Sequence, residues 1–188
     1  MIILGIDPGY AIVGFGVIEK DARGNCRVLD YGAINTPKEE DFPVRLAMIQ
    51  DGMKCLINKF KPDAVAVEEL FFNQNITTGI AVAEARGVIL CTAIQHVPKV
   101  FEFTPMQIKL AITGTGKAEK KQVQFMTKNM LKLKSIPKPD DAADALAVAL
   151  CLAQTNTKLT PSEVQVFTNN NLKKTSKDEI LNKRNIKK

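Results

Sequence analysis

The sequence predicts an α/β fold in which a mixed five-stranded sheet carries helices on both faces. Two observations support this prediction. Three strand-like segments follow one another near the N-terminus, and their short connections make them antiparallel neighbours. Beyond residue 40, segments with helical periodicity alternate with short apolar runs, which is typical of helices packed on a buried sheet.

The first strand is expected over the apolar run of residues 2–6, ending at Asp7, where Pro8 and Gly9 stop it. A continuous apolar run bounded by turn residues is typical of a strand buried on both faces. An ionised carboxylate seldom lies at the end of such a strand without a partner cation, because its desolvation is costly. Asp7 is therefore a candidate metal ligand, and the alternative is that it caps the Pro-Gly turn.

Two more strands and a helix are expected next. Residues 12–19 and 26–34 are strand-like, and the segment 21–25 is a turn between them because it contains Arg-Gly-Asn. A helix is expected from Asp41 to Phe60, since apolar residues recur there at helical spacing and a Lys-Pro-Asp sequence ends it. The three strands thus form a meander whose first strand ends in an acid.

A second strand that ends in an acid lies at Glu68. Residues 64–67 form a short apolar run that is closed by Glu68 and Glu69. A short loop then leads to a long, mostly apolar helix over 77–95, which is rich in small residues and permits close helix approach. Residues 97–103 are expected to be the fifth strand.

Three further helices complete the domain, over 105–112, 118–133 and 140–154. Thr104 and the proline after it are a typical N-cap and first helical residue. The polar, lysine-rich segment 155–188 is expected to be a flexible tail. The chain is therefore divided into a folded domain, residues 1–154, and a basic C-terminal tail.

Composition restricts the class of protein. The chain has 188 residues, of which 45% are apolar and 24% charged, as is ordinary for a globular protein. Because the sequence contains no long apolar run and no signal sequence, we expect a cytoplasmic protein without a membrane span. Four scattered cysteines and one histidine argue against a zinc site. Most of the net charge of +6 lies in the tail, where eight basic and three acidic residues give +5. Such a tail suits contact with a polyanion, but it is also a common solubilising end.

A second pair of acids lies at the start of the last helix. Asp141 and Asp144 are three residues apart, so they share one helix face among alanines. Capping of the helix N-terminus accounts for Asp140, but Asp144 lies a turn further in, within an apolar stretch. With Asp7 and Glu68 they make an all-oxygen set, which suits Mg²⁺ or Mn²⁺. Two such ions can activate water and stabilise the leaving oxygen in phosphodiester hydrolysis.

The ordered set of motifs over residues 1–154 resembles the RuvC-type Holliday junction resolvases, which have an RNase H-like fold. The motifs that carry the resemblance are G-I-D-P-G around Asp7, A-V-E-E around Glu68, E-A-R-G-V at 84–88, the segment around Lys109, G-K-A-E-K-K-Q-V-Q at 116–124 and D-D-A-A-D-A-L-A at 140–147. The opening motif alone is weak, because actin-like kinases begin similarly, whereas the ordered set is specific.

The resemblance implies a homodimeric endonuclease that cuts four-way DNA junctions by paired symmetric nicks and leaves 5′-phosphate and 3′-hydroxyl ends. It implies a site for Mg²⁺, with two ions that Mn²⁺ can replace, and a branch-migration motor complex as a partner. Glu69 and Asp140 stand beside motif positions and are placed outside the site. The residues at the positions of the family's catalytic, metal-binding acids are Asp7, Glu68, Asp141 and Asp144.

The resemblance also implies DNA contacts. Lys109 and Lys120 match basic positions that contact DNA, and Lys117 and Lys121 cluster with Lys120 as phosphate contacts. An alternative role for Lys120 is to stabilise the charge that develops on the phosphate. Phe71 matches an aromatic residue that stacks at the junction, and the alternative is that it belongs to the core.

Three other interpretations stay open on the sequence alone. Another RNase H-like nuclease, such as a ribosomal-RNA precursor processing factor, shares the acids without needing a junction-binding dimer. An actin-like kinase shares the opening strand but requires a second phosphate-binding loop and a longer, two-domain chain. A non-catalytic junction binder has no need of all four acids.

Overall fold

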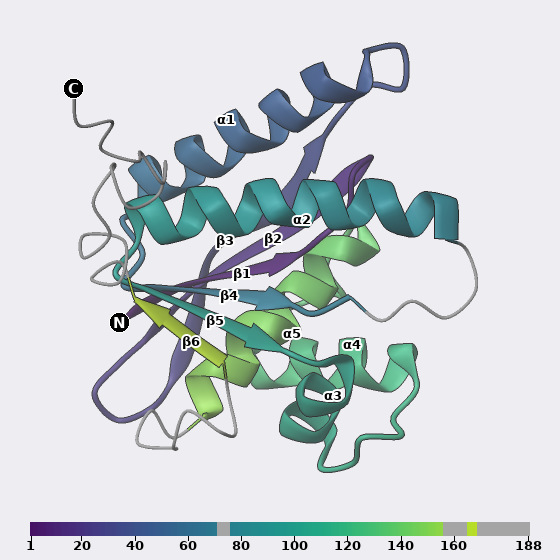
Figure 1. Cartoon of the computed structure of the whole chain (residues 1–188). Coiled ribbons are helices and arrows are strands. Elements are labelled where there is room, and N and C mark those ends of the chain that lie inside the picture. The colour runs from purple at the N-terminus through teal and green to yellow at the C-terminus, as the bar shows by residue number, and fades with distance from the viewer. Residues whose placement is uncertain (71–75, 156–164, 169–188) are drawn as a thin grey trace, which may run out of the picture.

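A mixed sheet lies at the centre of the structure, a computed structural model that describes residues 1–70, 76–155 and 165–168 (Figure 1). Within these residues its strands are β1 (Ile2–Asp7), β2 (Ile12–Lys20), β3 (Cys26–Asn35), β4 (Ala64–Glu68), β5 (Lys99–Phe103) and β6 (Gln165–Thr168). The spatial order is β3-β2-β1-β4-β5-β6. The first three strands are antiparallel, β1, β4 and β5 are parallel, and β6 returns antiparallel to β5. The predicted α/β class and mixed sheet are confirmed.

The predicted number of five strands is wrong, because Gln165–Thr168 adds a sixth strand at the edge of the sheet. Its register places Thr168 beside Lys99 and Gln165 beside Glu102. Four residues within a polar segment are too few to show strand periodicity, and the open edge of β5 supplies the hydrogen bonds that order them. This strand lies within the segment 155–188 that the sequence assigns to the tail.

The helices in the described residues are α1 (Phe42–Phe60), α2 (Ile76–His96), α3 (Pro105–Thr113), α4 (Lys120–Met130) and α5 (Asp140–Gln154). The predicted cap of α3 is present: the Thr104 side chain accepts a hydrogen bond from the Gln107 N–H, and the Gln107 side chain accepts one from the Thr104 N–H. The fourth helix is shorter than its predicted range of 118–133. Its cap lies at Glu119, whose N–H donates to the Gln122 side chain, so the helix begins at Lys120, two residues after the predicted start.

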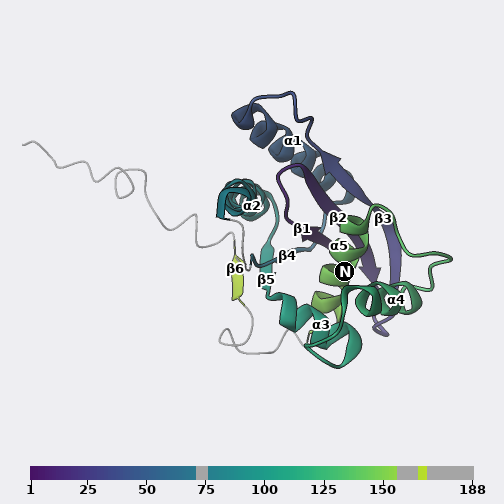
Figure 2. The same ribbon diagram turned by 90° about the vertical axis from the view of Figure 1, so that its right-hand side faces the viewer.

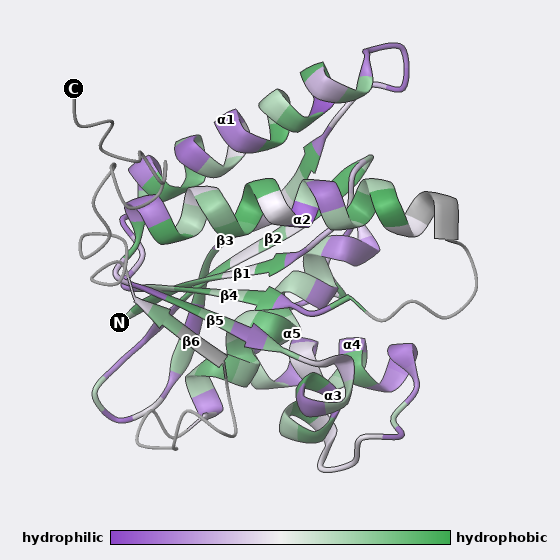
Figure 3. Ribbon diagram, in the orientation of Figure 1, coloured by the Kyte–Doolittle hydropathy of each residue, from purple (hydrophilic) through white to green (hydrophobic). Residues whose placement is uncertain are grey.

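Two helical layers cover the two faces of the sheet (Figure 2). α1 and α2 pack on one face, while α3, α4 and α5 pack on the other. α5 packs across β1 and β2 and is buried almost all round from Ala142 to Ala153. Its ribbon is correspondingly hydrophobic over most of its length (Figure 3). No helix in the described part of the chain is long and apolar enough to cross a membrane.

Glycines in β1 and β2 allow α5 to approach the sheet closely. A Cβ atom at Gly5 would lie 2.2 Å from the carbonyl oxygen of Ala145, and a Cβ atom at Gly14 would lie 2.1 Å from that of Asp141. Real Cβ contacts are essentially never below 3.0 Å, so only glycine fits at either position. The first turns of α5 therefore lie directly over the ends of the central strands.

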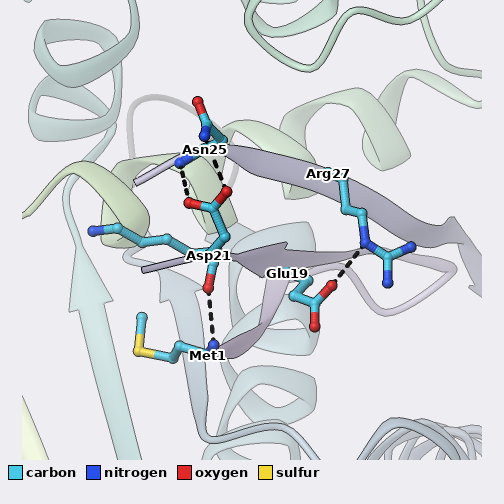
Figure 4. Close-up of polar contacts among 6 residues, drawn as sticks. Met1, Glu19, Asp21, Asn25 and Arg27 are labelled. Atoms are coloured by element: carbon cyan, nitrogen blue, oxygen red, sulfur yellow. Dashed lines mark hydrogen bonds and ion pairs between the residues drawn. The ribbon is translucent and has the colours of Figure 1, made fainter. Parts of the chain in front are cut away.

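The β2–β3 turn forms over the predicted residues and is closed by its own side chains. The Asp21 carboxylate accepts hydrogen bonds from the Asn25 N–H at 2.8 Å and from Asn25 Nδ2 at 2.9 Å (Figure 4). Next to the turn, Arg27 pairs with Glu19 across the two strands at 2.7 Å. These contacts lie at the end of β1 and β2 remote from Asp7, where they fix the register of the hairpin.

Candidate active site

Two carboxylates lie at the carboxyl ends of neighbouring parallel strands. Asp7 is the last residue of β1 and Glu68 is the last residue of β4, and the register pairs the preceding residues, Ile6 and Val67. Ile6 and Val67 are fully buried under α1 and α2. Because side chains alternate along a strand, Asp7 and Glu68 face the opposite layer, which contains α5.

α5 supplies a third carboxylate to this edge, and α3 and α4 supply basic groups. Asp141 begins the same face of α5 and lies close enough to contribute to the raised pKa of Asp7 and of Asp144. The charged side chains that line a cavity of about 390 Å³ are Asp7, Glu68, Lys109, Lys120 and Asp144. The structure thus brings three of the four predicted acids and two of the predicted lysines into one cavity, and the charge of the fourth acid, Asp141, acts on two of those acids.

Lys120 binds Asp144 directly. Its Nζ lies 2.6 Å from Asp144 Oδ2, and the two side chains are 58% and 20% exposed. Burial lowers the pKa of the Lys120 ammonium, but the hydrogen bond and charge of Asp144, with the charges of Asp7 and Asp140, outweigh it and raise that pKa. Lys120 therefore provides a firmly held positive charge among the acids.

Burial opposes ionisation of the acids. It raises the pKa of Asp7 from 3.8 to about 8, with further contributions from the charges of the other three acids. Burial and the charge of Asp144 raise the pKa of Glu68 from 4.5 to about 7. Burial also raises the pKa of Asp144, although its hydrogen bond with Lys120 opposes the rise. A bound divalent cation would reverse this balance, because it stabilises the ionised carboxylates.

The donor chemistry fits a hard divalent cation. The groups of the cavity that can ligate a metal are carboxylate oxygens, the ligands that Mg²⁺ and Mn²⁺ prefer. In the described residues, however, no three Asp, Glu, His or Cys side chains are already arranged as a metal site. Lys120 pairs with Oδ2 of Asp144, so in this structure that oxygen faces an ammonium rather than a cation held jointly with Asp7 and Glu68.

Lys117 and Lys121, the other two predicted lysines, do not line this cavity. Lys117 is exposed, and Lys121 lines a separate, shallow pocket on the outer side of α4. Asp140 pairs with Lys138 at 2.6 Å on the exposed start of α5. Phe71 lies outside the described residues, so its role stays a prediction.

Two charged residues that sequence reasoning did not single out lie at the same edge of the sheet. Arg86 of α2 forms an ion pair with Glu102 of β5, and its Nε donates a hydrogen bond to the backbone carbonyl of Glu68 at 3.3 Å. The sequence signal for such a pair is an acid inside an apolar strand, since acids are almost never fully buried unless paired.

Comparison with known proteins finds relatives over most of the chain. The family model of crossover junction endodeoxyribonuclease RuvC matches residues 3–152. The curated crossover junction endodeoxyribonuclease RuvC of Halothermothrix orenii is 54% identical over 152 residues, which cover 80% of this chain and 91% of that protein. The protein of the same name from Clostridioides difficile is 47% identical over 156 residues, covering 83% of this chain and 92% of that protein.

Solved structures show the same relationship. Thermus thermophilus RuvC has a TM-score of 0.76 and 37% identity, covering 82% of this chain and 94% of that chain. The same protein in complex with a Holliday junction substrate has a TM-score of 0.73 and 34% identity, with the same coverage. The yeast mitochondrial Holliday junction resolvase, at 14% identity and a TM-score of 0.62 over 81% of this chain and 77% of that chain, shares the fold.

Proposed function

The chain belongs to the crossover junction endodeoxyribonuclease RuvC family, and we propose that it resolves four-way DNA junctions with the acidic cavity at the ends of β1 and β4. The observation that carries this proposal is the convergence of three carboxylates and two lysines in one cavity. Carboxylates are the ligands for catalytic cations, and lysines attract the phosphate that is to be cut. The fold is RNase H-like, and the relationship to RuvC proteins supports DNA as the substrate.

Nucleases of this family are metal-dependent, and the residues proposed to hold the metal are Asp7, Glu68, Asp141 and Asp144. When bound, a pair of Mg²⁺ ions, or Mn²⁺ in their place, supplies an activated water and neutralises the leaving 3′-oxygen in phosphodiester hydrolysis. The products are a 5′-phosphate and a 3′-hydroxyl. Asp7 and Glu68 are carried by buried strands, so their positions are set before the DNA arrives.

The lysines hold the scissile phosphate in this proposal. Lys120 holds Asp144 in this structure, and its half-exposed ammonium would pair with a phosphate oxygen if Asp144 bound the metal. Lys109 of α3 lines the same cavity and supplies a second positive charge for the phosphate. Lys117 and Lys121, which are exposed on and just before α4, contact phosphates further along the DNA, and Phe71 stacks on bases at the crossover.

A homodimer accounts for paired nicks, because two identical sites related by a two-fold axis meet two symmetric strands. The outward face of α2 is the proposed interface. Its exposed residues include Ile80, Ala83, Gly87 and Cys91, a stripe of apolar and small side chains. Small residues let two helices approach closely across the axis.

Residues 1–154 act as the nuclease domain, and the basic segment 155–188 adds non-specific affinity for the junction arms. A branch-migration motor complex in the cytoplasm is the proposed partner that delivers the junction.

A cleavage assay tests the function directly. A four-way DNA junction, a linear duplex and a structured RNA are each incubated with the protein, with Mg²⁺ or with a chelator. Symmetric paired nicks in the junction alone, and only with Mg²⁺, are expected. Cutting of the RNA or the linear duplex at a comparable rate would contradict junction resolution and favour an RNA-processing nuclease.

A further inference from the structure

Arg86 connects three elements at the edge of the sheet that carries the candidate active site. It lies on α2, its Nη2 pairs with the Glu102 carboxylate of β5, and its Nε donates to the backbone carbonyl of Glu68 at the end of β4. The side chains of Arg86 and Glu102 are 19% and 8% exposed, so the pair is largely withdrawn from water. Glu102 lies beside Val67 in the register and faces α2, on the sheet face opposite the acidic cavity.

The carbonyl that Arg86 binds has no donor in the regular hydrogen-bond ladder. Met1 and Lys20 exchange both backbone hydrogen bonds, so odd-numbered residues of β1 face β2 and even-numbered residues face β4. Glu69 donates to β5, so the backbone of Glu68 faces β1. The N–H of β1 that would donate to the Glu68 carbonyl is therefore that of residue 8, the next even-numbered residue after Ile6.

Residue 8 is proline, which carries no N–H. The same Pro-Gly sequence that ends β1 after the catalytic Asp7 therefore leaves the carbonyl of Glu68 without its donor from the strand. A buried carbonyl without a donor is unfavourable, and Arg86 supplies the donor from the other side of the sheet.

An ion pair at this position is not explained by stability alone. Well-packed apolar residues of similar volume often replace a buried ion pair without loss of stability. Apolar residues, however, have no N–H to give to the carbonyl of Glu68, whereas the guanidinium offers several donors in a fixed plane. Glu102 holds that plane in place and balances its charge.

We propose that Arg86, oriented by Glu102, is a positioning residue that fixes the backbone of Glu68 and so aligns its carboxylate with the other acids for metal binding and cleavage. This inference rests on the proposed function, because it assigns Glu68 to the metal site. Arg86 acts from the face opposite the cavity and through the backbone, so it does not itself touch DNA or metal.

Two sets of variants separate positioning from general stabilisation. The double variant Arg86→Met/Glu102→Leu removes both charges and refills the space with apolar atoms, so that neither charge is left buried alone. The variant Arg86→Lys keeps a cation beside Glu102 but loses the planar group that reaches two acceptors. The matched control is Arg27→Met/Glu19→Leu, which removes the Arg–Glu pair at the remote end of the hairpin.

The readouts are thermal unfolding, hydrogen exchange of the peptide over β4 in the metal-free protein, and single-turnover cleavage of bound junction across a Mg²⁺ titration. If Arg86 positions Glu68, the folded variants should bind the junction as the wild type does, and their backbone amides at the end of β4 should exchange faster. Cleavage should be about 10- to 100-fold slower, or should need a Mg²⁺ concentration higher by that factor. The control should match the wild type in all of these.

A folded Arg86→Lys or double variant that cleaves at the wild-type rate, with unchanged Mg²⁺ dependence and unchanged exchange at β4, would overturn the proposal. If the double variant does not fold, Arg86→Lys alone decides. The wild type and Asp7→Asn are assayed in parallel. Metal-dependent junction cleavage by the wild type that Asp7→Asn abolishes upholds the proposed function, whatever the Arg86 variants do.

Discussion

At the level of single residues, the candidate site gathers carboxylates in surroundings that oppose their charge. Asp7 and Glu68 have raised pKa values because they are buried near one another and near the acids of α5. Lys120 offsets part of this repulsion through its ion pair with Asp144. Such an arrangement is costly in the free chain and favourable once a divalent cation is present. It therefore favours a metal site over a structural cap as the role of Asp7.

Substitution of Asp7 by Asn tests that role. Loss of one ligand should lower Mg²⁺-dependent cleavage by about 100-fold or more, because the metal contributes several kcal/mol to the transition state. Junction binding, measured by electrophoretic mobility shift in a chelator, should be equal or tighter, since a negative charge near phosphate is removed. Near wild-type cleavage by this variant would refute the assignment of Asp7.

The raised pKa of Asp7 also predicts how stability depends on pH in the absence of metal. An acid whose pKa is raised by folding contributes most to the free energy of unfolding below its ordinary pKa, which is 3.8 for Asp7. That contribution is lost as the pH rises towards about 8. Asp7→Asn should therefore be more stable than the wild type near pH 8, by more than about 1 kcal/mol, and equally stable near pH 4. Chemical denaturation in a chelator measures this difference, and a gap that does not grow with pH would contradict it.

At the level of elements, α5 positions two acids because it lies unusually close to β1 and β2. The helix is buried over nearly its whole length, and Gly5 and Gly14 leave room for its backbone. Gly14 pairs with Asp7 in the sheet and also lies under Asp141. One glycine thus sets the separation between the acid of the first strand and the acids of the last helix.

Gly14→Ala should push the start of α5 away from the sheet. The added Cβ meets the Asp141 backbone, which cannot rotate aside as a side chain would, so we expect a loss of about 1–3 kcal/mol in stability and a larger loss of cleavage than unfolding explains. The control is Gly32→Ala in β3, where the added Cβ meets only ring atoms of Phe15, at 3.1 Å. Equal, small effects of the two variants on cleavage would contradict this role of Gly14.

At the level of the whole molecule, one face of α2 is exposed among the residues that the structure describes. The exposed stripe of α2 lies on the layer opposite α5, and the same helix carries Arg86 on its inner side. In a dimer formed through this stripe, the α2 helix of each subunit would lie at the interface, on the sheet face opposite that subunit's active site. The helix that assembles the subunits would then also hold Glu68 in position.

Gly87→Glu tests the dimer without disturbing the single chain. A Cβ atom at Gly87 would have no neighbour within 4 Å among the described residues, whereas glutamates at this position would bring like charges together across a two-fold axis. Light scattering at micromolar concentration should give a dimer for the wild type and a monomer for Gly87→Glu, with unchanged circular dichroism. Asn58→Glu, at an exposed position of α1, is the control and should stay dimeric. A wild-type monomer, both free and on a junction, would refute the dimer.

Much of the fold and site was predictable from sequence because the signals are local. Apolar runs that end in Asp7 and Glu68, and an acid at Asp144 inside an apolar helix, are visible without knowing what packs against them. The mixed α/β class and the positions of the helices followed from the same periodicity. The cap of α3 at Thr104 was also predictable, because a cap is formed by neighbours in the chain.

Only the tertiary structure decided which distant groups meet. The sixth strand exists because β5 offers an open edge to Gln165–Thr168, and four residues cannot signal that by themselves. The ion pair of Lys120 with Asp144 and the bond from Arg86 to the carbonyl of Glu68 join segments far apart in sequence. Periodicity specifies which face of an element is buried, whereas the partner of a buried charge depends on how the elements pack in three dimensions.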